Sequence, residues 1–149
     1  MTALFEHSPW VEARADARPS SGDRHVDLMA VVREASVEEQ LALIRAHPEL
    51  AGKAAIDRTL TDASAAEQAS AGLDRLTPQE YAHFHALNAA YRERFGFPFI
   101  LCVRLTDKAG ILAAMASRVA HDRDTEIATA IAEIGKIVRL RLEDLHGAR

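Results

Sequence analysis

The sequence predicts an all-α fold: a single compact domain over residues 1–149, with about seven to nine helices. Helix-start residues recur along the chain, and apolar residues are repeatedly spaced three and four positions apart. Only residues 97–103 (FPFILCV) have a composition typical of a β-strand. Because no second strand lies nearby to pair with it, we expect a buried extended segment there and no sheet.

Seven helices can be justified in chain order from their start signals. Each predicted range begins at a serine, threonine or aspartate, residue types that accept hydrogen bonds from the amides of the first turn. Ser36 and Thr77 are each followed three residues later by the glutamate that completes a capping box. The predicted helices cover approximately residues 8–15, 23–35, 36–46, 64–72, 77–96, 107–120 and 124–145.

The last helix has the clearest amphipathic pattern. Ile127, Ile131, Ile134 and Val138 follow the four-three-four spacing of a stripe that faces the core. Arg141 lies seven residues after Ile134 and therefore within about 20° of the same helical face. A guanidinium at this position either extends to solvent or holds an anion.

Composition and charge exclude several classes of function. A net charge of −4, with no basic stripe, argues against a nucleic-acid partner. No apolar run approaches the length of a membrane span, and the N-terminus lacks the pattern of a signal peptide. The single cysteine, Cys102, fits a reducing compartment. We therefore expect a cytoplasmic protein with no membrane partner.

His47 and Pro48 form the first of three polar motifs that suggest a site. Imidazole titrates near neutral pH and is suited to transferring a proton, and the proline restricts the local backbone that orients the ring. Pro48 also disfavours helical geometry at His47, which places the histidine at a helix end. A helix-end histidine is, however, more often a cap or a surface residue.

The second motif is Ser64, Glu67 and Gln68, whose spacing places the three side chains on one helical face. Ser64 and Glu67 could equally be a capping box, which needs no ligand. Gln68 is not required by that explanation, and its amide could bind a ring that carries carbonyl and N–H groups.

The third motif is the extended segment from Gly96 to Val103. If it is buried, its backbone N–H and C=O groups need partners, which a planar polar ligand could supply. The alternative is a plain connector between helices, packed by Phe95, Phe97 and Phe99. The residues alone do not decide between the two.

Metal and nucleophilic chemistry are not predicted. His83 and His85 lie two residues apart on a helix, so their side chains point about 200° apart and cannot bind one metal ion. No other cluster has metal-ligand spacing, and no glycine-rich phosphate loop follows a strand. Neither Ser64 nor Cys102 has an obvious histidine partner in the sequence.

Together these motifs resemble the family of 2-oxo-4-hydroxy-4-carboxy-5-ureidoimidazoline (OHCU) decarboxylases. The resemblance implies an all-α, cofactor-free and commonly dimeric enzyme that catalyses the last step from urate to (S)-allantoin. It spans nearly the whole chain, in the same order and with similar spacing. The stretches that carry it are residues 5–11, 41–53, 64–73, 91–100 and 137–142.

The resemblance also implies roles for individual residues. His47 is the expected catalytic acid/base, with Glu67 as the catalytic residue that orients or partners it. Arg141 is the choice for the family's late arginine, and Arg139 is the alternative alignment. The expected substrate-binding residues are Pro48, Ser64, Glu67, Gln68, Phe99, Ile100, Leu101, Cys102, Val103 and Arg141.

The chemistry of OHCU agrees with these expectations. Its carboxylate and hydroxyl share one ring carbon, beside a C=N group that bears the ureido substituent. The electron pair left by CO₂ can pass to that neighbouring imine, so the substrate supplies its own electron sink. We therefore expect an enzyme that uses no metal and no cofactor and acts on this small molecule, and the resemblance implies that it is a homodimer.

Three other functions remain open on the sequence. One is a non-catalytic helical module that binds allantoin or a ureido compound, although intact His47 and Glu67 argue against it. Another is a different cofactor-free lyase or hydrolase acting on a ureido or hydantoin ring, which only the closeness of the motifs disfavours. A protein-interaction domain would be expected to show an exposed apolar face.

Overall fold

The chain is all-helical, as the start signals predict. A computed structural model describes residues 4, 5, 7–50 and 62–147. In these residues it contains seven α-helices, one short 3₁₀ helix and no strand. The elements are α1 (Trp10–Asp16), α2 (Arg24–Glu34), α3 (Val37–Arg45), α5 (Asp62–Ser70), α6 (Pro78–Phe95), η1 (Val103–Leu105), α7 (Lys108–Arg118) and α8 (Arg123–Gly147).

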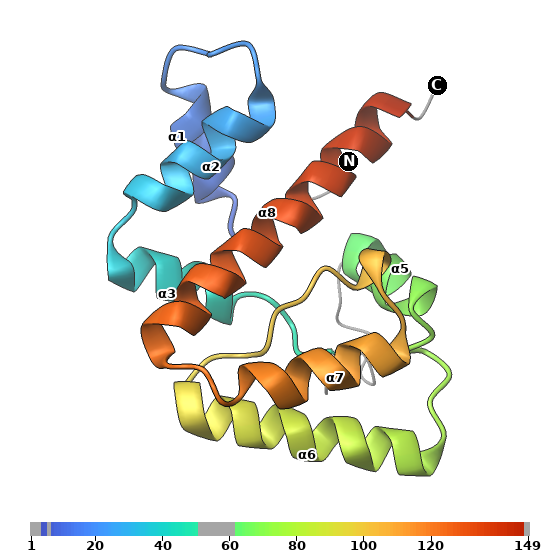
Figure 1. The fold of residues 1–149 in the computed structure, drawn as a ribbon. Helices are drawn as coiled ribbons and strands as arrows, with labels where there is room; N and C mark the ends of the chain where they lie inside the picture. Colours follow the sequence, from blue (N-terminus) through green and yellow to red (C-terminus); the bar gives the residue numbers. More distant parts are fainter. Residues whose placement is uncertain (1–3, 6, 51–61, 148–149) are drawn as a thin grey trace.

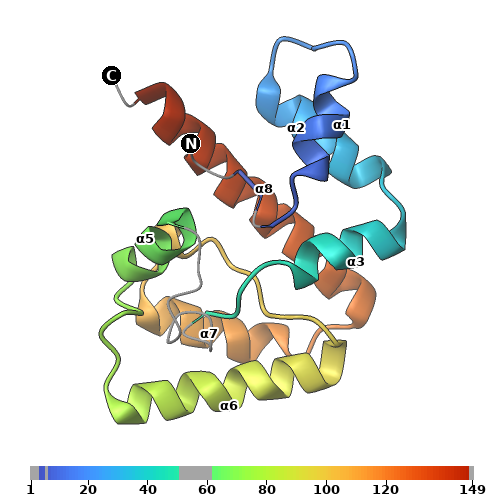
Figure 2. The same cartoon turned by 180° about the vertical axis from the view of Figure 1, so that it is seen from behind.

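The long helix α8 crosses the molecule and contacts helices from the first part of the chain (Figure 1). α1 packs against α2, and both α2 and α3 contact α8. α6 and α7 lie side by side and run in the same direction, while α5 lies beside η1 (Figure 2). Two consecutive helices can run the same way only if the chain returns between them, and residues 97–102 make this return.

The returning segment is buried among aromatic rings, as expected for an extended segment packed in the core. Phe97 and Phe99 are each 1% exposed. The ring centroid of Tyr91 lies 4.6 Å from that of Phe95 and 5.2 Å from that of Phe99. The segment is one residue shorter than predicted, because Val103 begins η1 and the Leu105 amide closes a turn onto the Cys102 carbonyl at 3.2 Å.

Several predicted helix starts are confirmed by their capping bonds. Ser36 and Thr77 form complete capping boxes with the glutamates three residues later, Glu39 and Glu80. The side chains of Asp23 and Asp107 accept bonds from the first turns of α2 and α7. These local bonds satisfy amides that have no partner within the helix.

Two predicted starts are wrong by one or two residues. Ser8 does not cap α1, which begins at Trp10 without a side-chain cap bond. α8 begins at Arg123, before the predicted Asp124, and Asp122 Oδ1 accepts the Thr125 amide at 2.7 Å. Asp122 and Asp124 lie only two residues apart, and either could accept a bond from the first turn of α8, so the pattern alone does not determine which one caps the helix.

The prediction for Ser64 is wrong in a way that matters for the site. α5 begins at Asp62, so Ser64 lies inside the helix and cannot form a capping box with Glu67. The C-terminal end is as predicted: Gly72 has a φ of 82° and donates to the Ala69 carbonyl at 2.9 Å. The next amide bonds to the Gln68 carbonyl at 3.0 Å, which completes a glycine-terminated helix end.

Within the described residues, no helix is both long enough and apolar enough to cross a membrane.

Candidate active site

One pocket brings together the end of α3, α5, the returning segment and the middle of α8. The space between atoms in this pocket amounts to about 440 Å³, a volume that includes the part open to solvent. Every predicted catalytic and binding residue contributes to its lining. Three further lining residues, Leu50, Arg104 and Ile137, were not predicted.

His47 follows the end of α3 and is 6% exposed. Its amide donates to the Ile44 carbonyl at 3.1 Å, and its ring Nδ1 lies 3.1 Å from the Leu43 carbonyl oxygen. Since a carbonyl oxygen only accepts hydrogen bonds, Nδ1 carries the hydrogen. In the neutral ring the basic lone pair is therefore on Nε2. This arrangement, a ring oriented by one nitrogen and basic at the other, is typical of histidines that transfer protons.

Arg141 and Glu67 form a bidentate ion pair in the pocket. Arg141 Nε donates to Glu67 Oε2 at 2.9 Å, and Nη2 donates to Oε1 at 2.7 Å. Arg141 is 1% exposed and also donates to the Ser64 hydroxyl at 3.1 Å and to the Leu4 carbonyl at 3.2 Å. The buried guanidinium is thus compensated by a carboxylate, as burial of a charge requires.

The structure places Arg141, and not Arg139, at the pocket. Arg139 is exposed on α8, and its Nη2 lies 3.4 Å from His25 Nδ1. The predicted partnership of Glu67 with His47 stays a prediction, because both Glu67 oxygens accept hydrogen bonds from Arg141.

Two amide side chains hold the backbone that follows Pro48. Gln68 Nε2 lies 3.5 Å from the Glu49 carbonyl oxygen, a long contact, and Asn88 Nδ2 donates to the Leu50 carbonyl at 2.8 Å. Gln68 and Asn88 are each 5% exposed. Asn88 was not predicted, although an asparagine among apolar positions of a helix is a signal that could have identified it.

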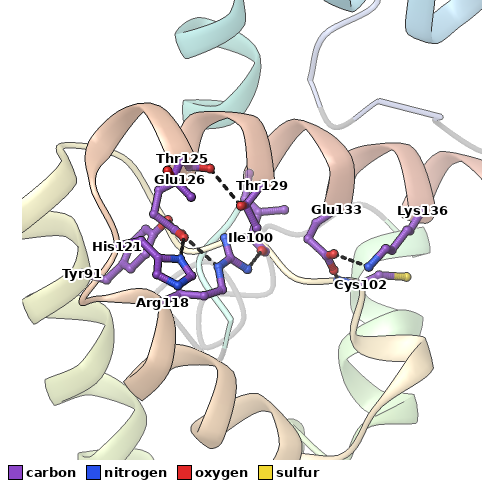
Figure 3. Close-up of polar contacts among 10 residues, drawn as sticks. All are labelled: Tyr91, Ile100, Cys102, Arg118, His121, Thr125, Glu126, Thr129, Glu133 and Lys136. Atoms are coloured by element: carbon purple, nitrogen blue, oxygen red, sulfur yellow. Dashed lines mark hydrogen bonds and ion pairs between the residues drawn. The ribbon is translucent and has the colours of Figure 1, made fainter.

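Two polar groups of the returning segment bind protein side chains (Figure 3). The Cys102 amide donates to Glu133 Oε1 at 2.9 Å. The Ile100 carbonyl accepts a hydrogen bond of 2.6 Å from Arg118 Nη1. The segment is therefore a packed connector that also forms one wall of the pocket, and binding of a planar ligand by its backbone stays a prediction.

A buried carboxylate on α8, Glu126, connects this wall to α6 and α7. Glu126 is 0% exposed and accepts hydrogen bonds from the Tyr91 hydroxyl at 2.5 Å and from Arg118 Nε at 2.9 Å. Its second oxygen lies 2.8 Å from His121 Nδ1. Burial and the hydrogen bond to Glu126 raise the pKa of Tyr91, so the phenol stays protonated. None of these residues was predicted.

Cys102 is poorly suited to act as a nucleophile. Burial, followed by the negative charges of Glu133 and Glu67, raises the pKa of its thiol, which disfavours the reactive thiolate. Among the residues that the structure describes, no group of three acidic, histidine or cysteine side chains could hold a metal ion. The chemical groups gathered at the pocket are an imidazole, a carboxylate–guanidinium pair and backbone amides.

The fold and this pocket define a class: a small all-helical protein whose pocket brings together an imidazole, a carboxylate–guanidinium pair and a buried extended segment. Residues 1–143 match the family model described as OHCU decarboxylase. The chain belongs to the OHCU decarboxylase family.

Known proteins are similar to this chain over most of its length. The 2-oxo-4-hydroxy-4-carboxy-5-ureidoimidazoline decarboxylase of Haloferax volcanii is 47% identical over 145 residues, which are 95% of this chain and 83% of that protein. A crystal structure of (S)-allantoin synthase is 31% identical with a TM-score of 0.67, covering 94% of this chain. This chain spans 46% of that longer one.

A second solved structure agrees in fold. The crystal structure of an OHCU decarboxylase in the presence of (S)-allantoin has a TM-score of 0.71 and covers 93% of this chain and 92% of its own. At 21% identity it supports the all-helical architecture alone.

Proposed function

We propose that this protein decarboxylates OHCU to (S)-allantoin without a cofactor, in the degradation of urate, with His47 as the acid/base. The observation that carries the proposal is the placement of His47 in a pocket lined by every residue that the sequence analysis assigns to the site. The similarity to named OHCU decarboxylases over 95% of the chain supports it further.

The reaction requires proton transfer more than electron withdrawal by the protein. The bond from the ring carbon to the carboxylate breaks, CO₂ leaves, and the electron pair passes to the adjacent C=N group. The hydroxyl loses its proton to become the ring carbonyl, the carbon that bears the ureido group gains one, and the ring nitrogen that received the electron pair takes up another from solvent. His47, basic at Nε2, is suited to move these protons, a role worth roughly 10²–10⁴-fold in rate.

The other pocket groups would bind the ring and select its face. The polar wall from Phe99 to Val103 would lie against the planar ring, while Ser64 and Gln68 would contact its polar substituents. The Arg141–Glu67 pair presents a guanidinium whose charge is already balanced. Such a pair would bind the departing carboxylate only weakly, so little binding energy would oppose its departure.

A coupled assay tests the activity. Urate, urate oxidase and the hydrolase that makes OHCU generate the substrate, and ultraviolet absorbance and circular dichroism then follow its decay and the handedness of the allantoin. We expect faster decay and one-handed product. Unchanged decay with racemic allantoin, from protein shown to be folded, would leave the non-catalytic binding module as the better explanation.

His47→Asn tests the assignment of the acid/base. Asparagine can still donate to the Leu43 carbonyl but cannot transfer a proton near neutral pH. We expect turnover to fall at least about 10²-fold while the helical circular dichroism spectrum is retained. Normal turnover in this variant would exclude His47 as the acid/base.

The resemblance also leads us to propose a cytoplasmic homodimer. The chain has a mass of 16.3 kDa, so light scattering on the purified protein distinguishes the two states directly. A mass near that of one chain at assay concentration would contradict the dimer.

A further inference from the structure

Two buried carboxylates of α8 are each connected to the backbone of the returning segment. Glu126 and Glu133 are 0% and 6% exposed and lie seven residues apart, on one face of the helix. Figure 3 shows Glu133 beside the Cys102 amide, and Glu126 reaching the Ile100 carbonyl through Arg118.

Carboxylates at these positions are costly, which argues that they have a specific task. Removing a charged group from water carries a large penalty that apolar side chains would not incur. The rest of this face of α8 includes such residues, for example Ala130 and Ile137. Glu133 accepts hydrogen bonds from the Cys102 amide at 2.9 Å and from Lys136 Nζ at 2.6 Å.

Fixing Ile100 and Cys102 also fixes the residue between them. In an extended backbone, residues two apart present their polar groups on the same side, and the intervening residue presents its own on the other. Leu101 lines the pocket. The bonds from Glu133 and Arg118 therefore determine how the amide and carbonyl of Leu101 are oriented.

We propose that Glu133, together with the Arg118–Glu126 pair, is a positioning device for the reaction: it holds the backbone of residues 100–102 in the orientation that receives the substrate. This inference rests on the proposed function, in which that backbone lies against the planar ring. Preorganised polar groups contribute to catalysis because they need not reorganise during the reaction.

Glu133→Gln and Glu133→Met form a matched pair of test variants. Both remove the charge and the ion pair with Lys136, and both side chains are close in length to glutamate. Only glutamine retains an oxygen that can accept the Cys102 amide. A difference between the two variants therefore reports on that single hydrogen bond.

We expect the glutamine variant to retain most of the activity. The methionine variant should show a kcat/KM at least about tenfold lower than the glutamine variant, and (S)-allantoin should bind it more weakly by a similar factor, because a buried amide loses its acceptor. Both measurements are made well below the unfolding temperature, with circular dichroism as the check on folding. Equal values in the two folded variants would overturn the proposal.

Lys136→Met is the control for the ion pair. It removes the ammonium group that donates to Glu133 and leaves the bond from the Cys102 amide in place. The value of kcat/KM should therefore stay within about twofold of that of the unmodified protein. A loss as large as that of Glu133→Met would assign the effect to the ion pair and contradict the positioning role.

Amide hydrogen exchange on the unmodified protein provides a test that needs no variant and no activity. Without ligand, the Cys102 amide should already be strongly protected, because its acceptor is part of the protein. Rapid exchange at Cys102, with protection gained only on adding (S)-allantoin, would contradict a preformed wall. Absence of decarboxylation by the unmodified protein would instead contradict the proposed function and leave this result standing.

Discussion

The guanidinium of Arg141 is almost completely buried and is committed to several protein groups at once. It donates to both oxygens of Glu67, to the Ser64 hydroxyl and to the Leu4 carbonyl. Only a planar fork of donors can make these bonds together, and the ammonium group of lysine offers a single point of attachment. The geometry of the pair, more than its charge, is therefore what Arg141 supplies to the pocket.

Arg141→Lys should consequently lower activity although the charge is conserved. Charge-assisted hydrogen bonds each contribute about 1.5–3 kcal/mol, so losing one should reduce kcat/KM by roughly 10–100-fold. The coupled assay measures this directly. Arg139→Lys is the matched control on the same helix, at an exposed position. Equal losses in both variants would remove Arg141 from the site.

At the scale of the helices, local start signals were the most predictable part of the fold. The capping boxes at Ser36 and Thr77 depend on side chains within one turn, so the sequence determines them without tertiary information. Ser64 fits the same pattern but lies inside α5 and accepts a bond from Arg141. A serine three residues before a glutamate cannot reveal by itself whether its partner is local or 77 residues away.

Thr77→Ala tests the contribution of the cap of α6. Removing the hydroxyl that accepts the Glu80 amide should destabilise the protein by about 1 kcal/mol and lower Tm by a few degrees. Thermal unfolding followed by circular dichroism measures the change. Thr77→Ser keeps the hydroxyl and should cost much less; if both variants lose the same stability, the methyl group and not the cap is responsible.

The ion pair between Arg14 on α1 and Glu39 on α3 should make the free energy of unfolding depend on pH. Hydrogen bonds from Arg14, and then from the Ser36 amide, lower the pKa of Glu39 from 4.5 to about 2. Because the folded pKa is lower than the unfolded one, the stabilisation is present above pH 4.5 and is lost as the pH falls toward 2. Both groups are exposed, so the effect is modest and screened by salt.

Glu39→Gln should therefore destabilise the protein at neutral pH and have progressively less effect as the pH is lowered. Urea unfolding at several pH values and low ionic strength measures this trend. Glu38→Gln removes a carboxylate of the same helical turn outside the pair and serves as the control. A difference between the two variants that persists unchanged near pH 2 would contradict the assignment to Glu39.

At the scale of the whole molecule, every residue predicted to be catalytic or substrate-binding lines the pocket, together with three lining residues that were not predicted. The polar groups that support the pocket were missed. Arg141 was found because it continues the apolar stripe of the last helix. The same spacing does not identify Glu126 and Glu133, which lie about 100° around the helix from Ile127 and Ile134 and are nevertheless buried. In the sequence, a buried glutamate of the last helix cannot be distinguished from a solvent-exposed one until its partners on other helices are known.

The partners of Glu126 come from elements far apart in the sequence, which is why no local pattern identifies them. Tyr91 lies on α6, Arg118 on α7 and Glu126 on α8. Arg118 also stacks over Phe99, with its guanidinium carbon 4.3 Å from the ring centroid. The network thus connects three helices and the pocket wall, and we expect its loss to weaken the whole domain.

Arg118→Met should destabilise the protein by about 3 kcal/mol, because it leaves the buried Glu126 without its guanidinium. Tyr91→Phe removes one hydrogen bond and keeps that pair, so it should cost about 1 kcal/mol. Equilibrium urea unfolding measures both.

The decisive comparison is the double variant Arg118→Met with Glu126→Leu, which removes both charges. A charge buried without its partner costs more than an apolar pair, so the double variant should be more stable than Arg118→Met alone. If the losses of stability caused by Arg118→Met alone and by Glu126→Leu alone simply add in the double variant, Glu126 is not held by Arg118, and the pocket wall has some other support.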